Sequence, residues 1–112
     1  RKMNFKNSNI WSEKGSTLSL DNAVKEYGIT EVEIIDTIKA GKLQSRLNYA
    51  HGNPYYKLIR SEVESFVKNK YGDSYLKKQK RKIELEIINK QLRKYRKQIK
   101  LLEKRKYELE DD

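Results

Sequence analysis

The sequence predicts a mainly α-helical protein, in which a small head of three helices and a β-hairpin precedes one long C-terminal helix. Three observations predict this fold class. Between Leu18 and Leu43, apolar residues recur at helical spacing in two short segments joined by a glycine turn. Residues 44–59 alternate at strand spacing. From Tyr75 onward the chain has no glycine or proline, and apolar residues recur at alternating steps of three and four.

The first fifteen residues form a polar and basic segment without a hydrophobic period. They are interpreted as a disordered arm or as a basic arm that contacts a phosphate backbone or lies in a minor groove. A further alternative concerns Trp11, which could fold back onto the core as an apolar lid.

Residues 18–43 are expected to form two helices and a tight turn. Ser19 is placed to cap the first helix, and Gly28 suits the left-handed residue that ends it. Thr30 and Glu33 have the spacing of a capping box at the start of the second helix, which ends at Gly41. Two helices joined by a short glycine-containing turn make a helix-turn-helix motif.

The next segment is expected to be a hairpin of two strands, joined by a loop over residues 50–54 that is rich in turn-forming residues. Arg46, Asn48 and Lys57 would offer cationic and amide groups to phosphates and base edges. The alternative is an ordinary polar hairpin whose tyrosines cover a small core. Ser61 is then placed to cap a third helix.

A break at Gly72–Ser74 suggests three parts: a basic arm over residues 1–15, the helical head over 16–73 and a coiled-coil helix over 74–112. A heptad repeat marks the last part, with Lys106 at one seam position. The predicted dimerisation residues are Leu85, Ile88, Leu92, Tyr95, Ile99, Leu102 and Leu109. A homodimer is expected, while parallel and antiparallel pairing, and a hetero-oligomer, all stay open.

The formal net charge is +10, with 12 basic and 9 acidic residues in 1–73 and 14 basic and 7 acidic residues in 74–112. A basic chain attracts nucleic acid through counterion release, although a lysine-rich helix can also be basic simply because it is solvated. With one histidine and no cysteine, a structural zinc site is not expected. The sequence shows no catalytic constellation, so neither an enzyme nor a cofactor is expected. Because it shows no membrane-length apolar run and no signal peptide, an intracellular location is expected, in cytoplasm, nucleoid or nucleus.

About half of the chain resembles the MerR and phage-excisionase family of winged helix-turn-helix domains. The resemblance rests on Ala23, the Gly28-Ile29-Thr30 turn, Ile34, Ile38 and Gly41-Lys42-Leu43, and continues through the hairpin into residues 60–66. Each element is common, but the ordered run of them is not. The region from Asn53 to Gly72 also faintly resembles the DNA-binding part of the xeroderma pigmentosum group A repair protein.

The resemblance implies double-stranded DNA as the partner and a role in transcription regulation, DNA segregation or recombination. Where the family's second helix bears Arg, Ser, Thr and Tyr, this one bears Glu31, Glu33 and Asp36. DNA contacts are therefore expected beyond that acidic face, at Lys39, Lys42, Arg46 and Lys57, with Thr30 and Asn48 as lesser candidates. The alternative function is a protein-interaction scaffold, in which Val32 and Ile35 face a protein partner.

Overall fold

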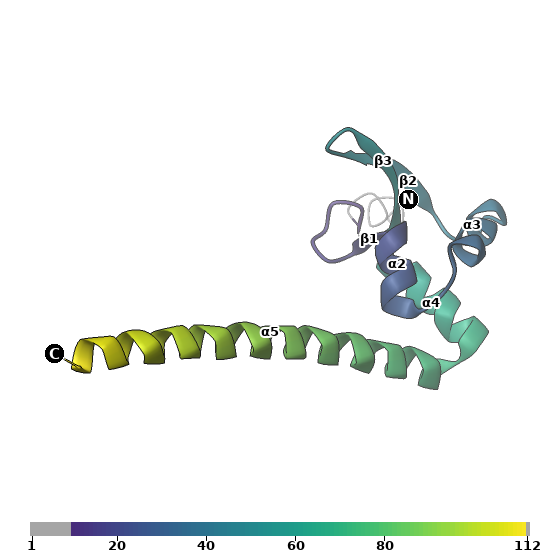
Figure 1. Cartoon of the computed structure of the whole chain (residues 1–112). Coiled ribbons are helices and arrows are strands. Elements are labelled where there is room, and N and C mark those ends of the chain that lie inside the picture. Colours follow the sequence, from purple (N-terminus) through teal and green to yellow (C-terminus); the bar gives the residue numbers. More distant parts are fainter. Residues whose placement is uncertain (1–9, 112) are drawn as a thin grey trace. The chain divides into compact units, whose positions relative to one another are not determined.

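The computed structural model describes residues 10–111, and these residues form four helices and one three-stranded antiparallel sheet (Figure 1). The elements are, in chain order, β1 (Thr17–Ser19), α2 (Leu20–Tyr27), α3 (Glu31–Lys39), β2 (Ser45–Ala50), β3 (Asn53–Ile59), α4 (Arg60–Tyr71) and α5 (Asp73–Glu110). The predicted mainly helical class with a small sheet and a long C-terminal helix is confirmed. Most of the predicted N-terminal arm, residues 1–9, lies outside the described residues.

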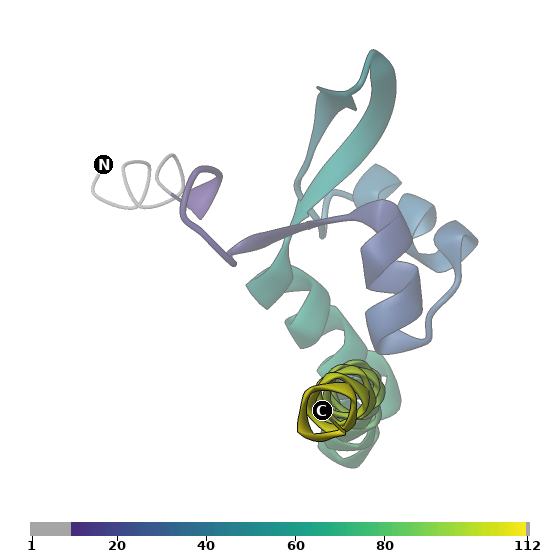
Figure 2. The same cartoon turned by 60° about the vertical axis from the view of Figure 1, so that its left-hand side comes forward.

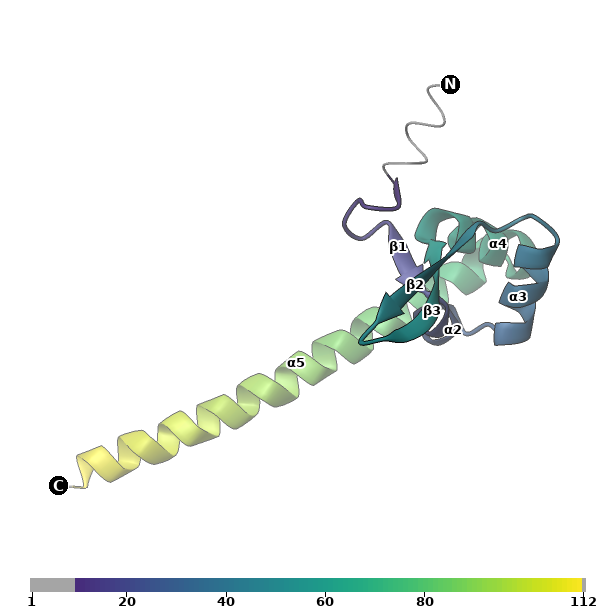
Figure 3. The same ribbon diagram turned by 90° about the horizontal axis from the view of Figure 1, so that it is seen from above.

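Strand β1 was not predicted from the sequence, and it completes the sheet by pairing with β3 from Thr17↔Ile59 to Ser19↔Lys57. The strand order is therefore β1-β3-β2, with the short β1 beside the hairpin (Figure 3). Three residues are too few to show an alternating pattern. Ser19 also ends β1 and caps α2, so its capping signal hides the strand.

The hairpin turn is tighter than predicted, because only His51 and Gly52 lie outside the strands. Both residues have positive φ, 54° and 82°, and two such residues give a turn whose twist matches that of the strands. Asn53 and Pro54 therefore belong to β3. Proline is tolerated there because β1 reaches only to Lys57, which leaves Pro54 with β2 as its one neighbour. Within the head, the turn end projects away from α2, α3 and α4 (Figures 1 and 2).

The caps of α2 and the N-terminal cap of α3 are as predicted, whereas α3 ends at Lys39 with Ala40, and not Gly41, as its C-cap. The Ser19 hydroxyl accepts from Asn22 N at 3.1 Å, and Gly28 ends α2 at φ 65°. Thr30 and Glu33 form the complete capping box of α3. The apolar sides of the two helices then meet the sheet and α4 in one core, in which Ala23, Ile34, Leu58, Val63 and Val67 are fully buried.

The predicted cap of α4 is wrong: Ser61 lies inside the helix, whose N-cap is Ile59 with no side-chain cap. The reason is that the chain passes directly from β3 into α4. The backbone N–H of Arg60 donates to Ser16 O at 2.8 Å, and this bond continues the β1–β3 pairing into the first residue of the helix.

The first two turns of α5 pack with the head. Leu76 is buried in the same core, and the Tyr75 hydroxyl is 2.8 Å from Tyr27 O and 3.1 Å from Gly28 O. The chain divides into two compact units between Lys80 and Arg81, a few residues beyond the helix break at Gly72. The head unit thus includes the base of α5, and the second unit is the rest of that helix.

Candidate nucleic-acid interface

Three of the predicted DNA-binding residues share one face of the hairpin. Arg46 pairs directly with Lys57 across β2 and β3, and Asn48 pairs with Tyr55 one step further out. Residues two apart on a strand point to the same side, so these four side chains lie on the face opposite to Leu58, which is buried in the core. The Asn48 amide also lies 3.5 Å from the Tyr55 hydroxyl. A cationic and amide-bearing surface is therefore presented by two neighbouring strands.

Trp11 supports this basic face. Its ring lies 4.6 Å from the guanidinium carbon of Arg46, and its backbone oxygen accepts from Lys57 Nζ at 2.8 Å. Stacking fixes a guanidinium while leaving its N–H groups at the edge available. An ammonium that makes one hydrogen bond keeps two donors. Both cations are thus oriented by the fold yet still able to bind an anion.

Trp11 itself is 6% exposed, but it lies outside the main core cluster. The lid alternative is therefore correct only in part: the indole folds back, but it covers the basic side of the sheet and not the core. The sequence alone does not predict Arg46 as the partner of Trp11, because no local pattern links the two residues.

The remaining predicted DNA-binding residues lie on α3 or just after it. Thr30 is occupied by the capping box, where its hydroxyl accepts from Glu33 N at 3.1 Å. Lys39 and Lys42 are exposed at the C-terminal end of the helix, and Lys42 lines a hollow of about 640 Å³ between α3 and α4. Within residues 10–111, no side-chain hydrogen bond, ion pair or ring contact joins Lys39 or Lys42 to the hairpin face.

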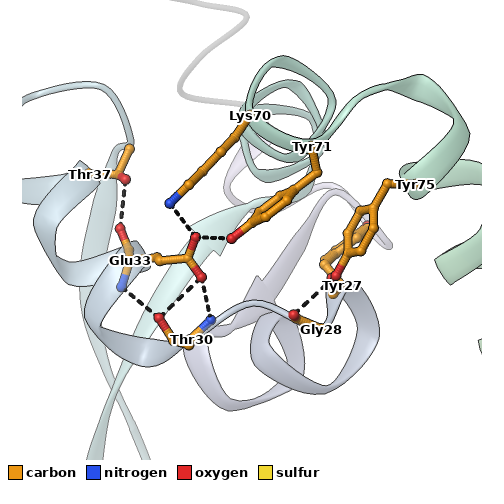
Figure 4. Close-up of polar contacts among 8 residues, drawn as sticks. All are labelled: Tyr27, Gly28, Thr30, Glu33, Thr37, Lys70, Tyr71 and Tyr75. Carbon is orange, nitrogen blue, oxygen red and sulfur yellow. Dashed lines mark hydrogen bonds and ion pairs between the residues drawn. The ribbon is translucent and has the colours of Figure 1, made fainter.

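Glu33, one of the three acidic residues on α3, is held by α4 and does not act as a free surface charge. Its carboxylate accepts from Lys70 Nζ at 2.5 Å, from the Tyr71 hydroxyl and from Thr30 N at 2.9 Å (Figure 4). These bonds, led by the one from Lys70, lower the pKa of Glu33 to about 2. Glu31 and Asp36 make no such bonds among the described residues, so they remain as exposed carboxylates.

A second polar cluster, which the sequence did not predict, joins α2, α4 and the base of α5. Arg60 NH1 donates to Glu26 at 2.8 Å and to the Tyr27 hydroxyl at 2.9 Å, and that hydroxyl donates to Glu64 at 2.6 Å. Lys80 pairs with Glu64 at 3.0 Å. The tyrosine hydroxyl is saturated and every charge has a partner, so the cluster holds three helices together and offers no free group for chemistry.

The pKa shifts in this cluster agree with a structural role. Burial, followed by the bond to Glu64, raises the pKa of Tyr27. Burial also pushes the pKa of Glu64 upward, but the hydrogen bonds from Tyr27 and Lys80 outweigh it and the net shift is downward. Glu64 is therefore held as a carboxylate and Tyr27 as a neutral phenol.

The predicted dimerisation residues all lie on α5 and are exposed. Their exposed fractions run from 41% to 69%, for Leu85, Ile88, Leu92, Tyr95, Ile99, Leu102 and Leu109. The helix is continuous from Asp73 to Glu110 and is seen nearly end-on in Figure 2. Seven exposed apolar side chains thus follow one helix at heptad spacing.

No helix in the described part of the chain is long and apolar enough to cross a membrane. Over the same residues, no group of three or more His, Cys, Asp and Glu side chains is placed to hold a metal ion. Comparison of the sequence and structure with protein-family models, curated proteins and solved structures found no match.

Proposed function

We propose that the head is a winged helix-turn-helix domain of the MerR and excisionase type, and that the protein binds double-stranded DNA as a dimer. The hairpin would be the wing. The observation that carries the proposal is the cross-strand pair of Arg46, which is exposed, and Lys57, which is half-buried, both oriented by Trp11. Cations held in this way bind phosphates with little loss of side-chain freedom.

The exposed heptad seam supports the dimer. Two helices with apolar residues at a 3.5-residue period form a stable coiled coil when these residues pack against each other. Pairing two heads doubles the phosphate contacts and converts the second contact into an intramolecular one. Roles in transcription regulation, DNA segregation or recombination fit such a protein.

The test is fluorescence anisotropy of a labelled duplex, measured at several salt concentrations with the molecular mass recorded in parallel. The double variant Arg46→Glu/Lys57→Glu is expected to weaken binding more than tenfold. If each cation contacts one phosphate, the salt dependence, d log K/d log[salt], falls in magnitude by about 2 per head. Far-UV circular dichroism shows whether the variant is folded, because fluorescence of Trp11 would respond to the loss of its own contacts with Arg46 and Lys57.

A matched control separates local contacts from net charge. Lys25 and Lys68 are exposed cations in the last turns of α2 and α4, outside the two strands of the hairpin. The variant Lys25→Glu/Lys68→Glu changes the net charge by the same amount and is expected to alter affinity about twofold or less. Equal loss of affinity in both variants would mean that only overall charge matters, and the hairpin assignment would then be wrong.

The second candidate function is a protein-interaction scaffold. It is favoured by the outer side of α3, where Val32 is 67% exposed between the carboxylates of Glu31 and Asp36. If the protein does not bind the duplex at low salt but still forms an oligomer, the scaffold function fits better than DNA binding.

A further inference from the structure

The second face of the hairpin is apolar, in contrast to the basic face. Leu47 lies opposite Tyr56, and Tyr49 lies opposite Pro54. These residues are in step with Leu58, which is fully buried, and so they lie on the core side of the sheet. The strands nevertheless run past the end of the core, and Leu47, Tyr56 and Tyr49 are 54%, 44% and 66% exposed.

This apolar face continues onto α3. Ile35 and Glu31 of α3 line a small hollow of about 190 Å³ together with Pro54 and Tyr56 of β3. Val32 lies three residues before Ile35, and residues three apart are neighbours on a helix surface. We call the set Val32, Ile35, Leu47, Tyr49 and Tyr56 the apolar patch.

The border of the apolar patch is acidic. Asp21 and Glu31 line the hollow itself, and Asp36 lies further round the exposed side of α3. None of these three carboxylates has an ion-pair partner within residues 10–111, although the whole chain has a net charge of +10. No lysine or arginine lines the hollow.

We propose that the apolar patch docks a protein segment that presents apolar side chains together with lysine or arginine. A group of exposed apolar side chains with a polar border is typical of a surface that binds another protein. The three free carboxylates favour a cationic partner and disfavour a phosphate backbone. This docking does not depend on DNA binding, because the basic face and the apolar patch use opposite sides of the same two strands.

The test uses the full chain and a labelled 18-residue peptide with leucine at helical spacing and lysine at the other positions. A second peptide carries glutamate in place of each lysine. The protein's net charge of +10 attracts the glutamate peptide non-specifically, so preference for the lysine peptide reports the acidic border. The lysine peptide is expected to bind at least tenfold more tightly and to weaken as salt increases.

Variants locate the site. Leu47→Thr and Val32→Asn are each expected to weaken lysine-peptide binding at least fivefold, and Glu31→Lys is expected to reduce the preference for that peptide. Leu101→Asn is the control, because Leu101 is 61% exposed on α5 and is not part of the apolar patch. Duplex binding by Leu47→Thr and Val32→Asn should stay within twofold of the unmodified protein.

Three outcomes would overturn the proposal. The first is equal or tighter binding of the glutamate peptide. The second is a loss of duplex binding in Leu47→Thr as large as that in Arg46→Glu/Lys57→Glu, which would make the apolar patch a nucleic-acid contact. The third is a change of molecular mass in the patch variants without a change in peptide affinity, which would make the occupant a second copy of the chain.

Discussion

Replacing Gly28 by alanine should destabilise the head more than the same change at Gly41. Both glycines have a positive φ, 65° and 77°, so alanine costs about 1–2 kcal/mol at either position. The two sites differ in space. A Cβ at Gly28 would lie 2.8 Å from the Tyr75 hydroxyl, whereas a Cβ at Gly41 meets nothing within 4 Å.

The extra cost at Gly28 can be derived from the contacts of Tyr75. Its hydroxyl must move away from the new methyl group and so loses its bond to Tyr27 O or Gly28 O. One such hydrogen bond contributes about 0.5–1.5 kcal/mol. Gly28→Ala is therefore expected to cost about 1.5–3.5 kcal/mol in total, and Gly41→Ala about 1–2 kcal/mol.

Urea unfolding at one fixed protein concentration measures both changes. Trp11 fluorescence follows the head, because the single tryptophan is buried there. A Tyr75→Phe background supplies the decisive control. Without the hydroxyl the shortest contact is removed and only the Gln79 side chain remains, at 3.1 Å, so most of the difference between Gly28→Ala and Gly41→Ala should disappear in that background. If Gly28→Ala costs no more than Gly41→Ala in the unmodified protein, the base of α5 does not pack on the α2–α3 turn as described.

Two further predictions concern the acidic side of α3 and the seam of α5. Hydrogen bonds, of which the one from Lys70 has the largest effect, lower the pKa of Glu33 from an ordinary 4.5 to about 2. The charged form of Glu33 therefore stabilises the head above about pH 4.5, and this stabilisation is lost as the pH falls toward 2. Glu33→Gln should flatten the loss of stability between pH 5 and pH 2 in urea unfolding, whereas Glu31→Gln, which removes an unpaired carboxylate, should not. Ile99→Asp places a charge in the seam and should reduce a dimer to a monomer in light scattering at micromolar concentration. Leu101→Asp, off the seam, should leave the mass unchanged, and a dimer that survived Ile99→Asp would exclude pairing through the heptads.

The elements with local signals could be predicted from the sequence. The caps at Ser19, Gly28 and Thr30 depend on residues within one helical turn, so the sequence is sufficient to locate them. Strand β1 depends instead on Ile59, which is distant in the chain, and its three residues carry no pattern of their own. The false cap at Ser61 has the same origin, because pairing between β1 and β3 decides where α4 begins.

The candidate site was predicted in part for a related reason. Alternation along a strand puts Arg46 and Asn48 on one side, and the sequence shows this directly. It does not show that Trp11 folds onto Arg46, or that Arg60 reaches Glu26, because both contacts arise from tertiary packing between distant segments. The fold therefore gives the charged residues two different roles. Arg46 is a cation held in a fixed orientation, whereas Arg60 links one helix to another.

The two-residue turn at His51–Gly52 gives the hairpin an unusual sensitivity to insertions. Because the opposite sides of β2 and β3 differ in chemistry, the turn decides which side chains point outward on each of them. If one residue were inserted there and the strands re-paired with a one-residue shift, every side chain of one strand would move to the opposite face of the hairpin. Arg46 would then face Tyr56 in place of Lys57, so a change at the exposed turn could disrupt the basic face and the apolar patch together.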